Sequence, residues 1–150
     1  MSSPLALAQE VVRMYAYQFP VDISRIISDY GILVDYISTG DEFNGMYMRY
    51  PLPIITVNVR QNITRQRFTL AHELFHHLTC QDDACTLRFS TTKERTAGER
   101  RARSFAASLL MPEQAIRSLL ALGLEKDKLL QAFFVSQEAL DIRLRELKIA

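Results

Sequence analysis

The stretch RQRFTLAHELFHHL, residues 65–78, contains all three histidines of the 150-residue chain. They are His72, His76 and His77, and Glu73 directly follows the first. Apolar residues recur in the stretch at spacings of three and four, which predicts an amphipathic helix. On that helix His72 and His76 lie on one face, about one turn apart. The sequence therefore predicts a helix that presents two imidazoles side by side.

Two neutral imidazoles in this arrangement can bind one divalent metal ion. Glu73 lies about 100° around the helix from His72, so its carboxylate can border the ion and take a proton from the attacking water. The His-Glu-x-x-His pattern is typical of zinc hydrolases. The alternative is a coincidence on an ordinary helix, but the rarity of histidine and the adjacent Glu73 favour a metal site. His77 points away from His76, and we interpret it as a packing or surface residue.

A third ligand is needed, and the chain has no further histidine. A metzincin would need a glycine and a histidine where this chain has Thr79 and Asp82. The third ligand must then be a carboxylate or a thiolate. Cys80 lies about 12 Å along the helix from His72, too far to share an ion unless the helix breaks first. Asp82 and Asp83 fall in a predicted loop with no rigid element to hold them.

Glu99 is the favoured third ligand. It opens the helix predicted for residues 96–111, on a face that continues through Ala102 and Ala106. A carboxylate on such an apolar face needs a charged partner when it is buried, and a metal ion provides one. The alternative is a capping box in which the Glu99 side chain bonds only the backbone of Thr96. The two histidines that lack a third ligand favour the metal site.

Length and composition predict one globular domain spanning residues 1–150. The formal net charge of +1 gives no electrostatic case for a nucleic-acid or acidic-membrane partner. The chain has no apolar run of about 18 residues to span a bilayer, and its N-terminus lacks the basic region of a signal peptide. With only two cysteines, Cys80 and Cys85, we expect reduced thiols and a cytoplasmic location.

Periodicity and turn signals divide the rest of the chain into further elements. Strands are expected at residues 32–38, 46–50 and 53–59. A polar loop is expected at residues 81–95, and helices are expected at residues 4–18, 22–30, 64–79, 96–111, 112–122, 125–133 and 136–147.

Two motifs together resemble the ImmA/IrrE family of metallopeptidases. RQRFTLAHELFHHL matches R-x-x-F-T-x-A-H-E-x-x-H, and ERRARSFAASLLMP (residues 99–112) matches E-x-x-A-x-x-F-A-x-x-L-L-M-P. ITVN and FVSQEALDIRLREL also look like segments of the family, so the resemblance covers nearly the whole chain. It implies an α+β, minimal gluzincin-like fold, in which a small twisted antiparallel sheet packs on the active-site helices and the C-terminal half is helical.

The resemblance also implies roles for residues and partners. His72, His76 and Glu99 would bind one Zn²⁺ per chain, and Glu73 would be the catalytic glutamate. Members of the family often cleave a helix-turn-helix transcriptional repressor that controls mobile elements or stress genes, and others are toxin-like partners in two-gene modules. We therefore expect a zinc-dependent endopeptidase that acts on such a repressor, without direct contact to nucleic acid or membrane. The chain is too short for the additional DNA-binding or sensor domains of some members.

Two positions depart from the family's pattern. Phe75 replaces a usual glycine, and its ring is expected to narrow or fill the cleft beside the metal. Arg103 replaces a usual Asn or Asp that could accept an imidazole N–H. Peptide hydrolysis also needs a second electrophile for the developing oxyanion. The candidates are Tyr47, Tyr50, Arg67 and Arg103, and sequence does not choose among them.

Two other functions compete with peptidase activity. Residues 128–147 have a helix-turn-helix pattern, but Glu138 and Asp141 on the outward face of the second helix would repel DNA phosphates. We interpret this segment as a packing unit or a partner dock. A non-catalytic, zinc-stabilised binding protein with Phe75 filling the site is the other alternative. In a peptidase, a strand at residues 45–50 or 53–59 could bind an extended substrate by strand addition.

Overall fold

A computed structural model describes residues 3–15, 18–49, 52–79, 87–91 and 96–149. The helices are α1 (Pro4–Tyr15), α2 (Ile23–Asp29), α3 (Ile63–Thr79), α4 (Ala97–Leu110), α5 (Glu113–Ala121), α6 (Lys126–Phe133) and α7 (Gln137–Glu146). The strands are β1 (Leu33–Ile37), β2 (Phe43–Met48), β3 (Ile54–Asn58) and β4 (Leu87–Thr91). The predicted α+β fold class is confirmed, and the helical segments of the C-terminal half lie where the sequence predicts them.

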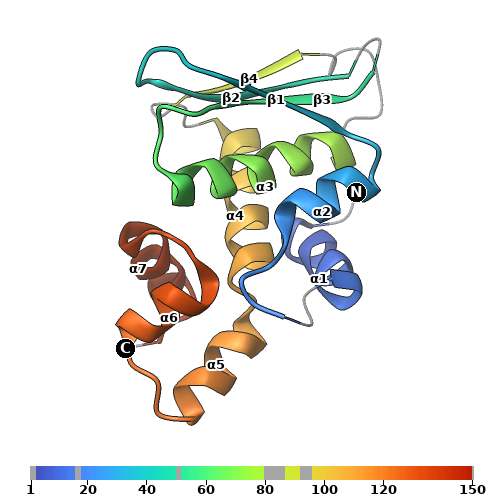
Figure 1. Cartoon of the computed structure of the whole chain (residues 1–150). Helices are drawn as coiled ribbons and strands as arrows, with labels where there is room; N and C mark the ends of the chain where they lie inside the picture. The colour runs from blue at the N-terminus through green and yellow to red at the C-terminus, as the bar shows by residue number, and fades with distance from the viewer. Residues whose placement is uncertain (1–2, 16–17, 50–51, 80–86, 92–95, 150) are drawn as a thin grey trace.

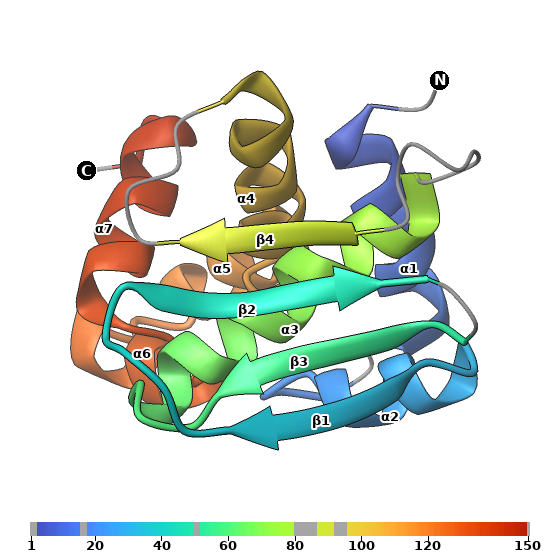
Figure 2. The same cartoon turned by 90° about the horizontal axis from the view of Figure 1, so that it is seen from above.

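The four strands form one sheet in the order β1-β3-β2-β4 (Figure 2). Strand β2 is antiparallel to both β3 and β4, whereas β1 is parallel to β3. The expectation of a wholly antiparallel sheet is therefore wrong for the β1–β3 pair. The chain reverses from β1 into β2 and reverses again into β3, and β3 then inserts between the two earlier strands. The sheet is consequently mixed.

Strand β4 is a second correction, because residues 81–95 were expected to be a loop. Leu87–Thr91 pairs with β2 and covers an edge that would otherwise present unpaired N–H and C=O groups. Strands β2 and β3 are thus both internal, and the edges of the described sheet are β1 and β4. The hypothesis that residues 45–50 or 53–59 bind substrate by strand addition is therefore wrong.

Local side-chain chemistry sets several helix boundaries as the sequence predicts. The Ser3 hydroxyl accepts a hydrogen bond from the Ala6 N–H, at 3.1 Å, at the start of α1. Ser136 does the same for the Ala139 N–H at the start of α7, also at 3.1 Å. Gly31 follows α2 with φ +74°, a left-handed conformation that favours glycine after a helix.

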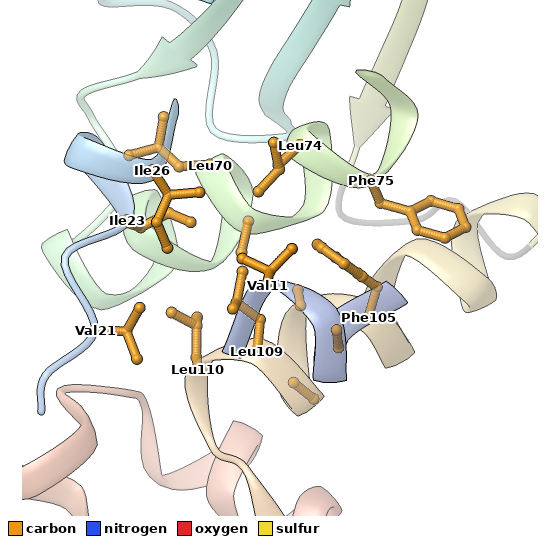
Figure 3. Close-up of a cluster of buried hydrophobic side chains, with 14 of the residues drawn as sticks. Val11, Val21, Ile23, Ile26, Leu70, Leu74, Phe75, Phe105, Leu109 and Leu110 are labelled. Carbon is orange, nitrogen blue, oxygen red and sulfur yellow. The ribbon is translucent and has the colours of Figure 1, made fainter. Parts of the chain in front are cut away.

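Helix α3 lies across one face of the sheet, and α4 packs beneath it and against α1 (Figure 1). Side chains of α1, α2, α3 and α4 converge below α3, among them Val11, Ile26, Leu74 and Phe105 (Figure 3). Fully burying a side chain of this kind contributes about 1.5–3 kcal/mol. The histidine-bearing helix is therefore held between the sheet and the helical core.

Two arginines, the buried Arg143 and the partly buried Arg67, anchor the C-terminal helices. The Arg143 Nε donates to the Met111 carbonyl, 3.0 Å away, at the end of α4. Arg67 of α3 donates to the carbonyls of Phe133 and Phe134, at 3.4 and 3.3 Å, at the end of α6. Burial lowers the pKa of both guanidinium groups from its usual value. Cations suit these positions because the last carbonyls of a helix are otherwise unsatisfied and partly negative. The hairpin of α6 and α7 is thereby tied to α3 and α4.

No helix among the described residues is long and apolar enough to cross a membrane.

Candidate metal centre and cleft

Three buried side chains form a compact group below the sheet. His72 and His76 lie one turn apart on α3, and their ring centroids are 5.2 Å apart. Glu99 reaches them from the first turn of α4. Its Oε2 is 2.6 Å from His72 Nε2, and its Oε1 is 3.1 Å from His76 Nε2. One potential ligand atom from each residue lies within 4.8 Å of the others.

The position of Glu99 separates the two roles considered for it. The Thr96 hydroxyl accepts a hydrogen bond from the Glu99 N–H, at 3.2 Å, so Thr96 does cap α4. The Glu99 carboxylate faces the two imidazoles. The cap therefore uses the backbone of Glu99 and leaves its side chain for the group of histidines.

The polar atoms of this group fit a divalent cation. Although His72 Nε2 and Glu99 Oε2 are only 2.6 Å apart, neither has a partner in hydrogen-bonding geometry within the described part of the chain. Buried polar atoms left in this way are costly. A cation bound between them would satisfy both, and two imidazoles with one carboxylate are a ligand set that zinc accepts.

Electrostatics favours the ligand-competent protonation states. Burial lowers the pKa of His72, which keeps its imidazole neutral, although the Glu99 carboxylate opposes the shift. Burial raises the pKa of Glu99, but the contacts with His72 and His76 outweigh burial and hold this pKa well below its usual value. Metal binding requires neutral imidazole and ionised carboxylate, so these directions suit a metal site.

Glu73 is fully buried on α3, on the side of the helix that faces β2. Strand β2 approaches closely there because residue 45 is glycine. A Cβ atom at Gly45 would lie 2.5 Å from Thr69 Cγ2, 2.7 Å from the Thr56 carbonyl oxygen and 3.9 Å from Glu73 Cγ. Gly45 therefore sets the spacing between the strand and the helix at Glu73. Sequence analysis missed this role, although a glycine inside a strand is a recognised sign of close backbone approach.

Gly45→Ala is expected to destabilise the fold by about 1–3 kcal/mol, because the backbone oxygen of Thr56 cannot rotate away from the added methyl group. We also expect lower activity in the peptidase that the family resemblance implies, since the displaced strand shifts Thr69 and Glu73. Thermal unfolding and a cleavage assay measure the two effects. Gly40→Ala is the matched control, because a Cβ there meets nothing within 4 Å. Equal stability of both variants would show that the close approach at Gly45 is unimportant.

A cleft of about 380 Å³ opens beside His72. Its walls come from the first half of α3, the start of α7, Asn44 of β2 and Arg103 of α4. The start of α7 is a second feature that sequence analysis did not place at the site.

The cleft distinguishes among the candidates for a second electrophile. The Tyr47 hydroxyl is 2.9 Å from His77 Nδ1, and this tyrosine is fully buried. Arg67 bonds the end of α6, as described above. Tyr50 lies outside the described residues. Arg103 lines the cleft together with His72, which makes it the best-placed candidate.

Phe75 does not line the cleft. Its side chain is 3% exposed, and its ring centroid lies 5.5 Å from that of Phe105 in the helical core (Figure 3). The ring therefore does not narrow the cleft beside His72, although it does lie next to the metal group, with its centroid 5.9 Å from that of the His76 ring.

His77 contacts Tyr47 and Tyr30 on another side of α3 and is not part of the metal group. The other residues considered as ligands, Cys80, Asp82 and Asp83, lie outside the described residues, as does Cys85.

Comparison with known proteins places this geometry in a family. Residues 27–145 match the family model Peptidase_M78, described as the IrrE N-terminal-like domain. No curated protein matches the chain significantly. The matched range contains His72, His76, Glu73 and Glu99, and every residue that lines the cleft. Since the match covers well over half of the chain, the predicted membership is confirmed, and the protein belongs to the IrrE-like Peptidase_M78 family of metallopeptidases.

Proposed function

We propose that residues 1–150 act as a single zinc-dependent endopeptidase domain, with one Zn²⁺ bound by His72, His76 and Glu99. One observation carries the proposal: three buried side chains offer ligand atoms within 4.8 Å of one another, and one of them, His72, lines an open cleft. Membership of a metallopeptidase family supports it. His72 Nε2 and Glu99 Oε2 lie 2.6 Å apart, yet neither has a partner in hydrogen-bonding geometry among the described residues, which supports a bound metal ion.

The residues around this group supply the steps of hydrolysis. Zinc, when bound, provides Lewis-acid polarisation of the scissile carbonyl and acidifies a water molecule. Glu73 accepts a proton from the attacking water and returns it to the leaving amine. Its carboxylate is buried next in sequence to a ligand, so it is held in place and shielded from bulk solvent. The Arg103 guanidinium supports the developing oxyanion from the wall of the cleft.

The proposed substrate is a helix-turn-helix transcriptional repressor in the cytoplasm, as the family resemblance implies. A DNA-binding role for α6 and α7 is disfavoured, because the start of α7 faces the cleft beside His72. A non-catalytic role is also disfavoured, because Phe75, which was expected to fill the site, does not line the cleft beside His72.

Incubation of the zinc-loaded protein with a candidate helix-turn-helix repressor tests the proposal. We expect discrete repressor fragments by mass spectrometry, because cleavage at one bond yields defined masses. Chelation should abolish the fragments, and added zinc should restore them. A stable complex in which the repressor stays intact would contradict the peptidase proposal and favour a binding protein.

A further inference from the structure

The cleft beside His72 has two helical walls that face each other. Phe68, Thr69 and His72 line it from α3, at spacings of one turn or less. Val135, Ala139 and Ile142 line it from the opposite side, at spacings of four and three along α7 and its preceding turn. His72 belongs both to this wall and to the metal group. Any group bound in the cleft is therefore adjacent to the position where the metal would polarise a carbonyl.

From this juxtaposition we infer that the cleft binds a large apolar side chain of the substrate beside the scissile bond, and that Ala139 and Ile142 of α7 select it. The inference rests on the proposed peptidase function, and it adds the specificity of the site.

The chemistry of the walls supports an apolar occupant. Phe68, Ala139 and Ile142 provide apolar surface from both sides, among polar side chains that include Asn44, Thr69 and Ser136. Ile142 remains 42% exposed, so folding alone does not bury it, and a substrate side chain would cover it. The volume of about 380 Å³ lies within the range of roughly 300–1,000 Å³ that is typical of ligand pockets.

The charged residues of the cleft are a weaker basis for recognition. Arg65 and Arg103 could attract an acidic side chain, but the Glu138 carboxylate lines the same cleft and opposes it. Arg103 is also the group proposed to face the oxyanion. An acidic occupant is therefore the competing outcome of the test.

The α7 wall is fixed in place rather than free to move aside. Arg143 of α7 bonds the end of α4, and Arg67 of α3 bonds the end of α6. A wall held by side-chain hydrogen bonds to two other helices keeps its shape, so it can discriminate between side chains by size.

Binding of three hydroxamic acids to the zinc-loaded protein, measured by calorimetry, tests the inference without a known substrate. Acetohydroxamic acid probes the metal alone, 3-phenylpropionohydroxamic acid adds an apolar group, and succinic monohydroxamic acid adds a carboxylate. We expect the phenyl compound to bind at least about tenfold more tightly than acetohydroxamic acid, because it buries apolar surface in the cleft.

Variants of α7 locate the effect. Ile142→Ser should remove most of the preference for the phenyl compound, and Ala139→Phe should block that compound by filling the cleft, while both retain binding of acetohydroxamic acid. Leu122→Ser is the matched control, because Leu122 is 75% exposed and does not line the cleft. Ile142 is also exposed, so its variant should fold normally, which circular dichroism checks.

The outcomes separate the inference from the proposed function. Equal affinities for the phenyl and methyl compounds would overturn the inference and leave the metal site intact. Tightest binding of the succinic compound would overturn it in favour of recognition by arginine. Failure of acetohydroxamic acid to bind a protein shown to contain zinc would overturn the proposed open catalytic site, and the inference with it.

Discussion

Glu73→Gln is expected to lower the rate of cleavage of the proposed repressor substrate by about 10²–10⁴-fold while the protein keeps its zinc and its fold. The amide has nearly the shape of the carboxylate, so it can occupy the same buried position under β2. It cannot accept the proton of the attacking water. The ligand atoms of His72, His76 and Glu99 are unchanged, which is why zinc should stay bound.

Three measurements make this result decisive: cleavage rate, zinc content and thermal unfolding of the same preparation. Glu10→Gln on α1 is the matched control. It makes the same chemical change at an exposed residue that does not line the cleft. Full cleavage by Glu73→Gln would show that another group acts as the base. Loss of zinc in that variant would show that Glu73 supports the metal site instead.

Glu99→Ala is expected to weaken zinc affinity by more than the roughly 10–100-fold that follows loss of an outer-shell partner, because it removes a direct ligand. His72→Ala and His76→Ala should do the same. Thr96→Ala removes only the helix cap, so it should cost about 1 kcal/mol of stability and retain zinc. Zinc content after dialysis against a weak chelator, with thermal unfolding, measures both effects.

His77→Ala is the matched control for the histidine variants. It should retain zinc, because His77 faces Tyr47 rather than the metal group. It should still lose about 1 kcal/mol of stability, since the Tyr47 hydroxyl would lose its hydrogen bond with His77. Similar zinc loss in all three histidine variants would mean that the ligand assignment is mistaken.

The parts of the site that sequence predicts are those fixed by helix geometry. The spacing of His72 and His76 places both rings on one face of α3 without knowledge of the rest of the fold. To predict Glu99 as a ligand, α4 must be expected to pack on α3. The apolar face of α4 indicates that packing. The three side chains lie together in the structure, and their role as metal ligands stays a prediction.

Features that depend on non-local contacts were harder to predict. Strand β4 is stabilised by its pairing with β2. A five-residue segment in a polar region has little strand pattern of its own in the sequence. The order of the sheet depends on insertion of β3 between β1 and β2. The direction of the Phe75 ring depends on Phe105, 30 positions later in the sequence. Each outcome is decided by a partner that is distant in sequence.

Both arginine anchors of the C-terminal hairpin bond main-chain carbonyls. Arg143 contacts the carbonyl of Met111, and Arg67 contacts those of Phe133 and Phe134, so these bonds do not depend on which side chains α7 turns toward the cleft. Positions 139 and 142 can therefore mutate while the backbone of the wall stays where it is. If α7 selects the substrate side chain as inferred, exchange of these two residues would alter specificity while the metal chemistry on α3 and α4 is left untouched.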